Sequence, residues 1–226
     1  MNPRSLDHVA LWVAERDELA SFLCEHLGMH VIERTDDFTL VGVDALLGKL
    51  TLFAAEGPRD RGALERVVLR VRDLEAAASR LPGELAARGE DGALLLDAPA
   101  GLPLGLVEHP DAVDYDIDHV VLRVGDPQAS AGALGELGFE RRNGRLEIAD
   151  RWLRLEPGGR REGERPLLNH LALLVDSAES SRAEAERAGM EIADFKDAAN
   201  TLAVFVWGPD RIKLEYVEHK PGFSLT

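Results

Sequence analysis

The chain has 226 residues, which allows one large domain or two of about 110 residues, each able to bury a hydrophobic core. Hydrophobic residues make up 45% of the sequence and charged residues 30%, a composition typical of globular proteins that excludes global disorder. The 41 acidic and 26 basic residues give a net charge of -15, so we expect neither nucleic acid nor an anionic membrane as a partner.

Cysteine content and the N-terminal sequence indicate the compartment. Cys24 is the only cysteine of the sequence and therefore cannot form an internal disulfide. The N-terminal sequence MNPRSLDHVALWV carries charges where a secretory signal needs an uninterrupted apolar stretch. No segment approaches the ~20 consecutive apolar residues of a membrane span. We therefore expect a cytoplasmic protein.

Four short segments of the sequence are nearly the same and predict an internal repeat. They read LDHVALWV, LERVVLRV, IDHVVLRV and LNHLALLV, and they span Leu6–Val13, Leu64–Val71, Ile117–Val124 and Leu168–Val175. Their starts are roughly 50–60 residues apart, a period that suits one small α+β module each. Leucine and β-branched residues dominate all four segments, so each is predicted to be a buried strand.

A helical pattern follows each of these strands, and further strands follow each helix. The predicted helices span Glu15–His26, Asp73–Arg88 with a break near Pro82, Asp126–Leu137 and Ser177–Ala188. Glycine stands at the expected end of three of them, at Gly28, Gly138 and Gly189. The later strands are predicted at Phe38–Val43, Lys49–Ala54, Arg145–Ala149, Arg151–Glu156, Thr201–Val206 and Ile212–Val217. Each module is thus βαβββ, with the second one compressed.

Four βαβββ modules, three of which open on LDHV, IDHV or LNHL, resemble the vicinal oxygen chelate superfamily of glyoxalases, bleomycin-resistance proteins and type I extradiol dioxygenases. The resemblance covers almost the whole chain. It implies an α+β fold in which modules pair into two incomplete eight-stranded barrels, each around a cup. We expect consecutive modules to pair, in a domain over 1–110 without metal and a domain over 116–226 that carries a metal site.

In that superfamily the metal ligands lie on the first and last strands of a module. Carried over to the third and fourth modules, these positions fall on His119, Arg154, His170 and Glu215. The resemblance thus implies a metal held by His119, His170 and Glu215, the ligand set of non-haem Fe(II) oxygenases. Fe(II) is the first expectation and Mn(II) the next, with Zn(II), Ni(II) or Co(II) left open. Arg154 cannot ligate a cation, but it could pair with an acidic group of the substrate or form a salt bridge to Glu215 or Glu156.

The corresponding positions of the first two modules predict no metal site. They fall on His8, Phe53, Arg66 and Gly105, which include a single ligand. We therefore interpret His8 as a structural histidine and the N-terminal cup as a copy that binds no metal.

The residues around the expected metal depart from those of ring-cleaving dioxygenases. The position of the family's second-sphere histidine falls near Lys196, and that of its tyrosine falls on Phe205. The hypothesis assigns Arg154, Lys196 and Asn200 to catalysis, with Lys196 acting as acid or base if burial lowers its pKa. It assigns Arg154, Trp152 and Phe205 to substrate binding.

The resemblance leaves three functions open. The first is an extradiol-dioxygenase-like oxidoreductase that acts on a small aromatic diol or an enolisable substrate chelated by the metal. The second is a metal-dependent proton-transfer enzyme of the glyoxalase or epimerase type, a lyase or isomerase. The third is a non-catalytic protein that binds a small molecule such as an antibiotic. All three imply a small-molecule partner, and assembly into a homo-oligomer is left open.

Overall fold

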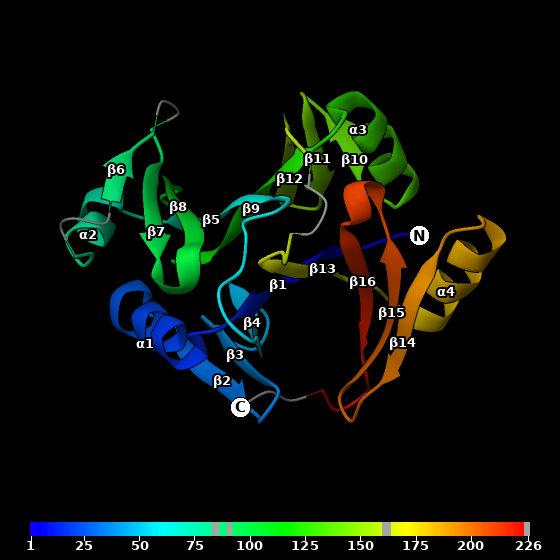
Figure 1. Ribbon diagram of the computed structural model, residues 1–226, viewed down its shortest axis with the longest axis horizontal. Coiled ribbons are helices and arrows are strands. Elements are labelled where there is room, and N and C mark those ends of the chain that lie inside the picture. The colour runs from blue at the N-terminus through cyan, green and yellow to red at the C-terminus, as the bar shows by residue number, and fades with distance from the viewer. Residues whose placement is uncertain (83–85, 90–91, 160–163, 224–226) are drawn as a thin grey trace.

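The computed structural model describes residues 1–82, 86–89, 92–159 and 164–223. These residues form two eight-stranded mixed sheets with four short α-helices (Figure 1). The prediction of an α+β fold built from four βαβββ modules with incomplete barrels is therefore confirmed, because neither sheet closes on itself.

The first two modules contain one strand, one helix and three further strands each. Module one consists of β1 (Ser5–Val13), α1 (Arg16–Leu27), β2 (His30–Arg34), β3 (Phe38–Gly42) and β4 (Lys49–Ala54). Module two consists of β5 (Leu64–Val71), α2 (Leu74–Ala78), β6 (Ala86–Arg88), β7 (Leu94–Ala98) and β8 (Leu102–Glu108), with a 3-10 turn at Pro99–Gly101.

The last two modules repeat the same order. Module three consists of β9 (Asp116–Val124), α3 (Pro127–Glu136), β10 (Glu140–Arg142), β11 (Arg145–Ile148) and β12 (Arg151–Pro157). Module four consists of β13 (Leu168–Leu174), α4 (Ala178–Arg187), β14 (Ile192–Asp197), β15 (Thr201–Trp207) and β16 (Lys213–His219), with a 3-10 turn at Pro209–Arg211.

Local sequence signals set where the helices begin and end. The side chains of Asp73, Asp126 and Ser177 accept hydrogen bonds from backbone N–H groups in the first turns of α2, α3 and α4. Gly28 ends α1 in the left-handed conformation, with φ of 59°. The predicted helix over Asp73–Arg88 is wrong beyond its first turns: α2 ends at Ala78 and β6 begins at Ala86, with the helix-breaking Pro82 between them.

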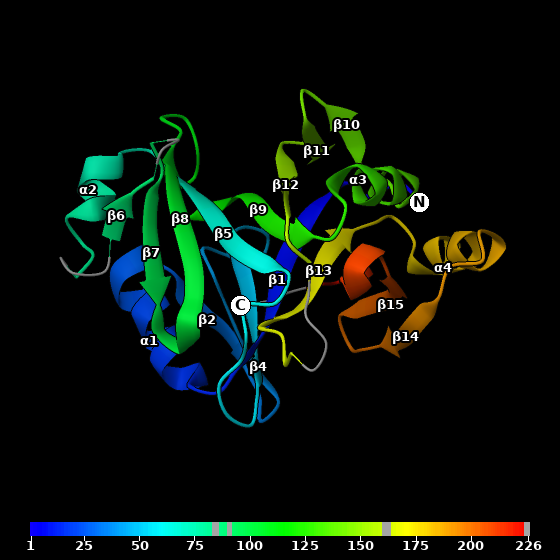
Figure 2. The same cartoon turned by 45° about the horizontal axis from the view of Figure 1, so that its top comes forward.

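The order of strands shows which modules pair. The first sheet runs β14-β15-β16-β13-β1-β4-β3-β2 and joins module four to module one, whereas the second runs β10-β11-β12-β9-β5-β8-β7-β6 and joins module three to module two. The N-terminal strand β1 lies between β13 and β4 in both views (Figures 1 and 2). The predicted division into two-module units at 1–110 and 116–226 is therefore wrong, because each sheet takes one module from each half.

The connections between successive modules differ little in length. The strands of successive modules are linked by residues 55–63, 109–115 and 158–167, which are short segments of similar length. The chain instead pairs the first strands of its modules antiparallel, β1 with β13 and β5 with β9. The first and fourth modules thereby share one sheet although the whole of the second and third lies between them in the sequence.

The two sheets share one hydrophobic core. Side chains on the helix-facing positions of the strands are fully buried, as Val9 and Leu11 are on β1 and Val120 and Leu122 are on β9. The opposite face of the central strands carries the polar side chains described below.

A buried polar contact also joins the two sheets. The Asp116 carboxylate accepts hydrogen bonds from the Gly48 backbone N–H at 2.9 Å and from the Arg151 guanidinium at 2.7 Å. Gly48 has φ of +63°, and a Cβ atom there would lie 2.6 Å from the Tyr115 carbonyl oxygen. This approach between the sheets therefore requires glycine.

No helix in the described part of the chain is both long enough and apolar enough to span a bilayer.

Candidate metal centre

Three neighbouring strands of the first sheet place three metal-ligating side chains on one face. His8 on β1 lies opposite Ala172 on β13, and Ala172 lies opposite Glu215 on β16. His170 precedes Ala172 by two residues, so its side chain points to the same face of the sheet. Because β1, β13 and β16 are adjacent, the three side chains converge.

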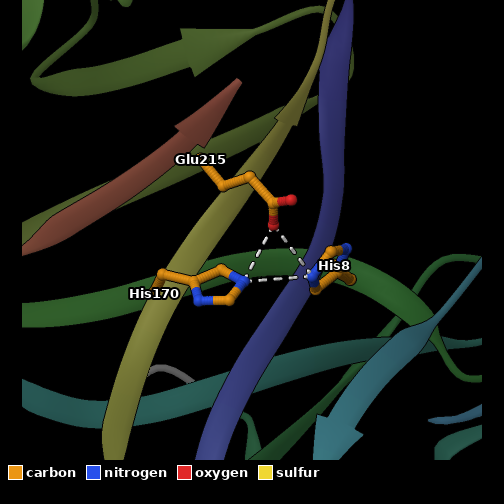
Figure 3. Close-up of side chains that lie close together, drawn as sticks. All are labelled: His8, His170 and Glu215. Carbon is orange, nitrogen blue, oxygen red and sulfur yellow. Dashed lines mark hydrogen bonds and ion pairs between the residues drawn. The ribbon is translucent and has the colours of Figure 1, made fainter. Parts of the chain in front are cut away.

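The ligating atoms of this group form a compact triangle (Figure 3). His170 Nε2 lies 2.8 Å from Glu215 Oε2, His8 Nε2 lies 3.4 Å from the same oxygen, and the two Nε2 atoms are 3.3 Å apart. All three side chains are largely enclosed, with exposed fractions of 14% for His8, 5% for His170 and 10% for Glu215.

This triangle fits a divalent metal ion. A cation about 2.1 Å from three ligands that subtend right angles holds those ligands about 3.0 Å apart. The distances between the three atoms, 2.8 to 3.4 Å, bracket that value. Two imidazoles and one carboxylate on one side of a cation leave its other side open, as in the facial triad of non-haem iron enzymes.

Neighbouring residues fix how both imidazoles present Nε2. His8 Nδ1 lies 2.9 Å from the Asp7 carboxylate, and His170 Nδ1 lies 3.1 Å from the Asn169 side-chain oxygen. A hydrogen bond from Nδ1–H to such an acceptor leaves the Nε2 lone pair for the metal. Asp7 also accepts hydrogen bonds at 2.8 and 2.9 Å from the buried ammonium of Lys49.

The buried carboxylates of the site favour binding of a cation. Burial opposes the charged form of His8, but hydrogen bonds to Asp7 and Glu215 and the charges of both carboxylates outweigh it and raise the His8 pKa to about 9. Burial likewise opposes ionisation of Glu215, yet the charge and hydrogen bond of His170, with those of His8, lower the Glu215 pKa to about 2. Two buried carboxylates are thus balanced by Lys49 and a proton on His8. A divalent cation would take the place of that proton.

The structure brings together two of the three predicted ligands. His170 and Glu215 lie side by side, whereas His119 is on β9 of the second sheet and takes no part in the group. His8, which the sequence analysis interpreted as structural, occupies the third position. The prediction of His119 as a ligand is corrected for one reason: module four pairs with module one and not with module three.

The pairing of β1 with β4 also corrects the ligand position that was predicted to fall on Phe53. His170 lies opposite Ala10, and Ala10 lies opposite Thr51 in the parallel pair. Thr51, and not Phe53, therefore occupies in module one the place that Glu215 occupies in module four. Phe53 is two residues farther along and forms part of the wall.

A cavity of about 630 Å³ opens beside the triad. Its apolar wall includes Phe38, Phe53 and Phe205, and the rings of Phe205 and His170 form a T-shaped pair with a centroid distance of 5.2 Å. The predicted residues Lys196 and Asn200 also border this cavity, so the structure brings both to the triad. Lys196 does not have the burial that its predicted acid–base role requires, because 66% of its side chain is exposed and its ammonium pairs with Asp194 at 3.1 Å.

His219 also borders this cavity, although no role was predicted for it from the sequence. Its Nε2 lies 3.3 Å from Asp7, and its ring stacks on Phe223 at a centroid distance of 3.8 Å. The sequence offers one signal for it: it follows Glu215 by four residues on the same strand and so shares its face.

Arg154 and Trp152, predicted to bind substrate near the metal, lie with His119 in the second sheet. They border a different cavity of about 430 Å³. The Arg154 guanidinium pairs with Glu156 at 2.5 Å, which is one of the alternatives considered for it. None of the three is among the described residues that line the cavity beside the triad.

Comparison with known proteins agrees with this architecture. Residues 5–83 match the model of the Glyoxalase/Bleomycin resistance protein/Dioxygenase superfamily. No curated protein matches the chain.

Several solved structures share the fold over nearly the whole chain. A putative dioxygenase from Bacillus subtilis matches with a TM-score of 0.80 at 18% identity, over 98% of this chain and 87% of that one. Glyoxalase I from Zea mays matches with a TM-score of 0.73 at 16% identity, over 95% and 92% of the two chains. The cppA protein from Streptococcus pneumoniae matches with a TM-score of 0.64 at 16% identity, over 96% and 99%. These similarities establish the fold.

Proposed function

We propose that this chain, which has the fold of the glyoxalase/dioxygenase superfamily, is a metal-dependent enzyme that acts on a small substrate at His8, His170 and Glu215. The observation that carries the proposal is the triangle of His8 Nε2, His170 Nε2 and Glu215 Oε2, whose edges of 2.8 to 3.4 Å suit one divalent ion. A metal bound there would hold two neighbouring oxygens of the substrate and supply Lewis-acid or oxygen chemistry.

The number of ligands supports a dioxygenase-like reaction, with Fe(II) or Mn(II) as the expected metal. Thr51 stands where a fourth ligand would lie, and a neutral hydroxyl is neither a strong ligand nor a base at neutral pH. Proton-transfer enzymes of the glyoxalase type commonly use a carboxylate at this position as the base. Three ligands with an open side suit a metal that must accept both substrate and oxygen.

The cavity wall suits a flat aromatic substrate such as a diol. Phe38, Phe53 and Phe205 line one part of it, and aromatic side chains bind planar rings by stacking or by edge contacts. The Asn200 amide lies at the same cavity and can donate a hydrogen bond to a substrate oxygen.

We assign the proton-transfer role to His219 in place of Lys196. The His219 side chain is only 15% exposed, borders the cavity and lies 3.3 Å from the Asp7 carboxylate. A carboxylate that contacts one ring nitrogen of an imidazole orients the ring and leaves the other nitrogen available. His219 can therefore accept a proton from a substrate hydroxyl.

The test is oxygen uptake by protein purified anaerobically without a metal-affinity tag and reconstituted in turn with Fe(II), Mn(II) and Zn(II). We expect uptake with at least one member of a panel of catechols, supported by Fe(II) or Mn(II) and lost in His8→Ala. His119→Ala is the matched control, because it removes the equivalent histidine of the other sheet and should retain activity.

Isomerisation of an enolisable substrate without oxygen uptake would contradict the dioxygenase proposal and favour the proton-transfer reaction. Binding of aromatic ligands that needs no metal, with no turnover, would favour the non-catalytic binding protein.

A further inference from the structure

We propose that the cavity of the second sheet is a separate site for a small ligand that carries a carboxylate or phosphate group, held by Arg145 and Arg154 beside His119. This site is independent of the triad. It lies on β9, β11 and β12, in the sheet that modules two and three form.

The second sheet has the backbone register of the metal centre but different side chains. Arg66 lies opposite Val121, and Val121 lies opposite Arg154, which repeats the row of His8, Ala172 and Glu215. His119 precedes Val121 by two residues, as His170 precedes Ala172. A guanidinium therefore replaces both the second imidazole and the carboxylate, and neither guanidinium can ligate a metal ion. Of these two arginines, Arg154 borders the cavity, whereas Arg66 borders a different one.

The residue before His119 orients its imidazole, as the residues before His8 and His170 orient theirs. Its Nδ1 lies 2.6 Å from the Asp118 carboxylate, and its side chain is 7% exposed at the cavity. With Nδ1–H donated to Asp118, Nε2 is left to interact with a ligand. The imidazole also stacks on Trp152 with a centroid distance of 3.8 Å, which fixes the plane of the ring.

Arg145 supplies a positive charge at this cavity. Its guanidinium lies over the Trp152 ring, 4.0 Å from the centroid. Over residues 1–82, 86–89, 92–159 and 164–223, no carboxylate lies within ion-pair distance of Arg145, although the chain carries 15 more acidic than basic residues. An arginine that has no carboxylate partner among the described residues can form a bidentate pair with a ligand.

Two of the acidic groups at this cavity are already paired. Asp118 contacts both His119 and His109, and Asp150 pairs at 2.9 Å with Arg70 and Arg151. The Nε atoms of these two arginines are buried without a hydrogen-bond acceptor. These pairs offset the charges of Asp118 and Asp150 at the cavity. Arg154 itself pairs with Glu156 at 2.5 Å, so its guanidinium would be shared between Glu156 and a ligand.

Glu147 is the acidic group that opposes an anion here. It borders the cavity, and its Oε2 lies 4.0 Å from Arg142 Nε, at the limit of an ion pair. Removal of the Glu147 charge should therefore strengthen anion binding, whereas removal of Arg145 or Arg154 should weaken it.

The test is titration of the full chain with inorganic phosphate and, separately, with benzoate, followed by the indole N–H resonance of Trp152 in NMR spectra. The Trp152→Phe variant identifies that resonance among those of Trp12, Trp152 and Trp207. We expect saturable shifts with at least one probe, an affinity about tenfold weaker in Arg145→Gln and in Arg154→Gln, and a tighter affinity in Glu147→Gln. Saturation by phosphate alone or by benzoate alone would identify the anionic group that the cavity prefers.

Two controls separate this site from the metal centre and from nonspecific charge. Arg187→Gln removes an exposed arginine at the end of α4, outside both cavities, and should leave the titrations unchanged. His170→Ala should also leave them unchanged, so the outcome does not depend on the proposed enzymatic function. Absence of saturation with both probes, or equal weakening by Arg187→Gln and Arg145→Gln, would overturn the proposal.

Discussion

Two cavities of this chain lie on strands that pair in the same register, but their side chains differ in charge. In the first sheet the row of positions across three strands carries His8, Ala172 and Glu215, and in the second it carries Arg66, Val121 and Arg154. The first cavity gathers negative charge and imidazole nitrogens, whereas the guanidinium groups of Arg145 and Arg154 border the second.

The comparison shows that the fold sets where side chains converge and not what they bind. Both sheets keep a histidine two residues before the central position of the row, at His170 and His119, and each histidine is oriented by the residue before it. The residues on the flanking strands decide between a cation and an anion. Function in this architecture therefore has to be derived from each site.

The largest expected effect is that of the metal on stability. At a free metal concentration ~1,000 times the Kd, binding to the folded state contributes ~4 kcal/mol. For a chain of this size that corresponds to a rise of about 8–16 °C in Tm. Calorimetry with and without a chelator measures the rise, which we expect in the wild type and in His119→Ala but not in His170→Ala. An equal rise in all three proteins would place the metal elsewhere.

Asp7→Asn tests the residue that orients His8. The Asp7 carboxylate lies 2.9 Å from His8 Nδ1, and replacing such an outer partner weakens metal binding by about 10- to 100-fold. Competition with a chromogenic chelator gives the Kd. The matched substitution in the second sheet, Asp118→Asn, should leave the metal Kd unchanged, and weakening by both substitutions to the same degree would contradict the assignment.

The raised pKa of His8 predicts a pH dependence. In the metal-free protein, the folded-state pKa of about 9 exceeds the ordinary value of 6.5. Protonated His8 therefore stabilises the fold fully below pH 6.5, and this contribution is lost as the pH rises through 9. Metal must displace the same proton, so we expect metal affinity to rise about tenfold from pH 7 to pH 8.

Isothermal titration in buffers of different ionisation enthalpy measures the protons released when metal binds. We expect about one proton per metal ion at pH 7. A metal Kd that is constant between pH 7 and pH 8 would contradict the coupling between His8 and the metal.

The smallest expected effect is that of replacing Thr51, which lies where a fourth metal ligand would lie. Thr51 lies at the cavity in the place equivalent to Glu215, and a hydroxyl contributes little to metal affinity. Thr51→Val should therefore change the metal Kd by less than about threefold. Thr51→Glu, which supplies a fourth strong ligand, should tighten it. A large loss of affinity in Thr51→Val would show that the site uses four ligands.

The repeat made most of the fold predictable. The strands LDHV, LERV, IDHV and LNHL mark the four modules, and alternation along each strand identifies its polar face. Lys49–Ala54 was predicted to the residue, and α1, α3 and α4 lie within a residue of their predicted bounds. These features depend on local sequence, which is why the sequence determines them.

The pairing of modules was not predictable, and the errors at the site follow from it. His8, His119 and His170 occupy the same place in three modules, so the repeat alone could not show which two share a cup. Pairing depends on contacts between segments such as β1 and β13, far apart in the sequence. Thr51 was missed for a related reason, because the register of β4 against β1 depends on hydrogen bonds that the sequence pattern does not specify.

The most direct test of the central claim is the metal content of three proteins purified anaerobically without a metal-affinity tag: the wild type, His8→Ala and His119→Ala. We expect about one iron or manganese ion per chain in the wild type and in His119→Ala, and almost none in His8→Ala. Metal that is retained in His8→Ala and lost in His119→Ala would contradict the account and place the metal centre in the second sheet.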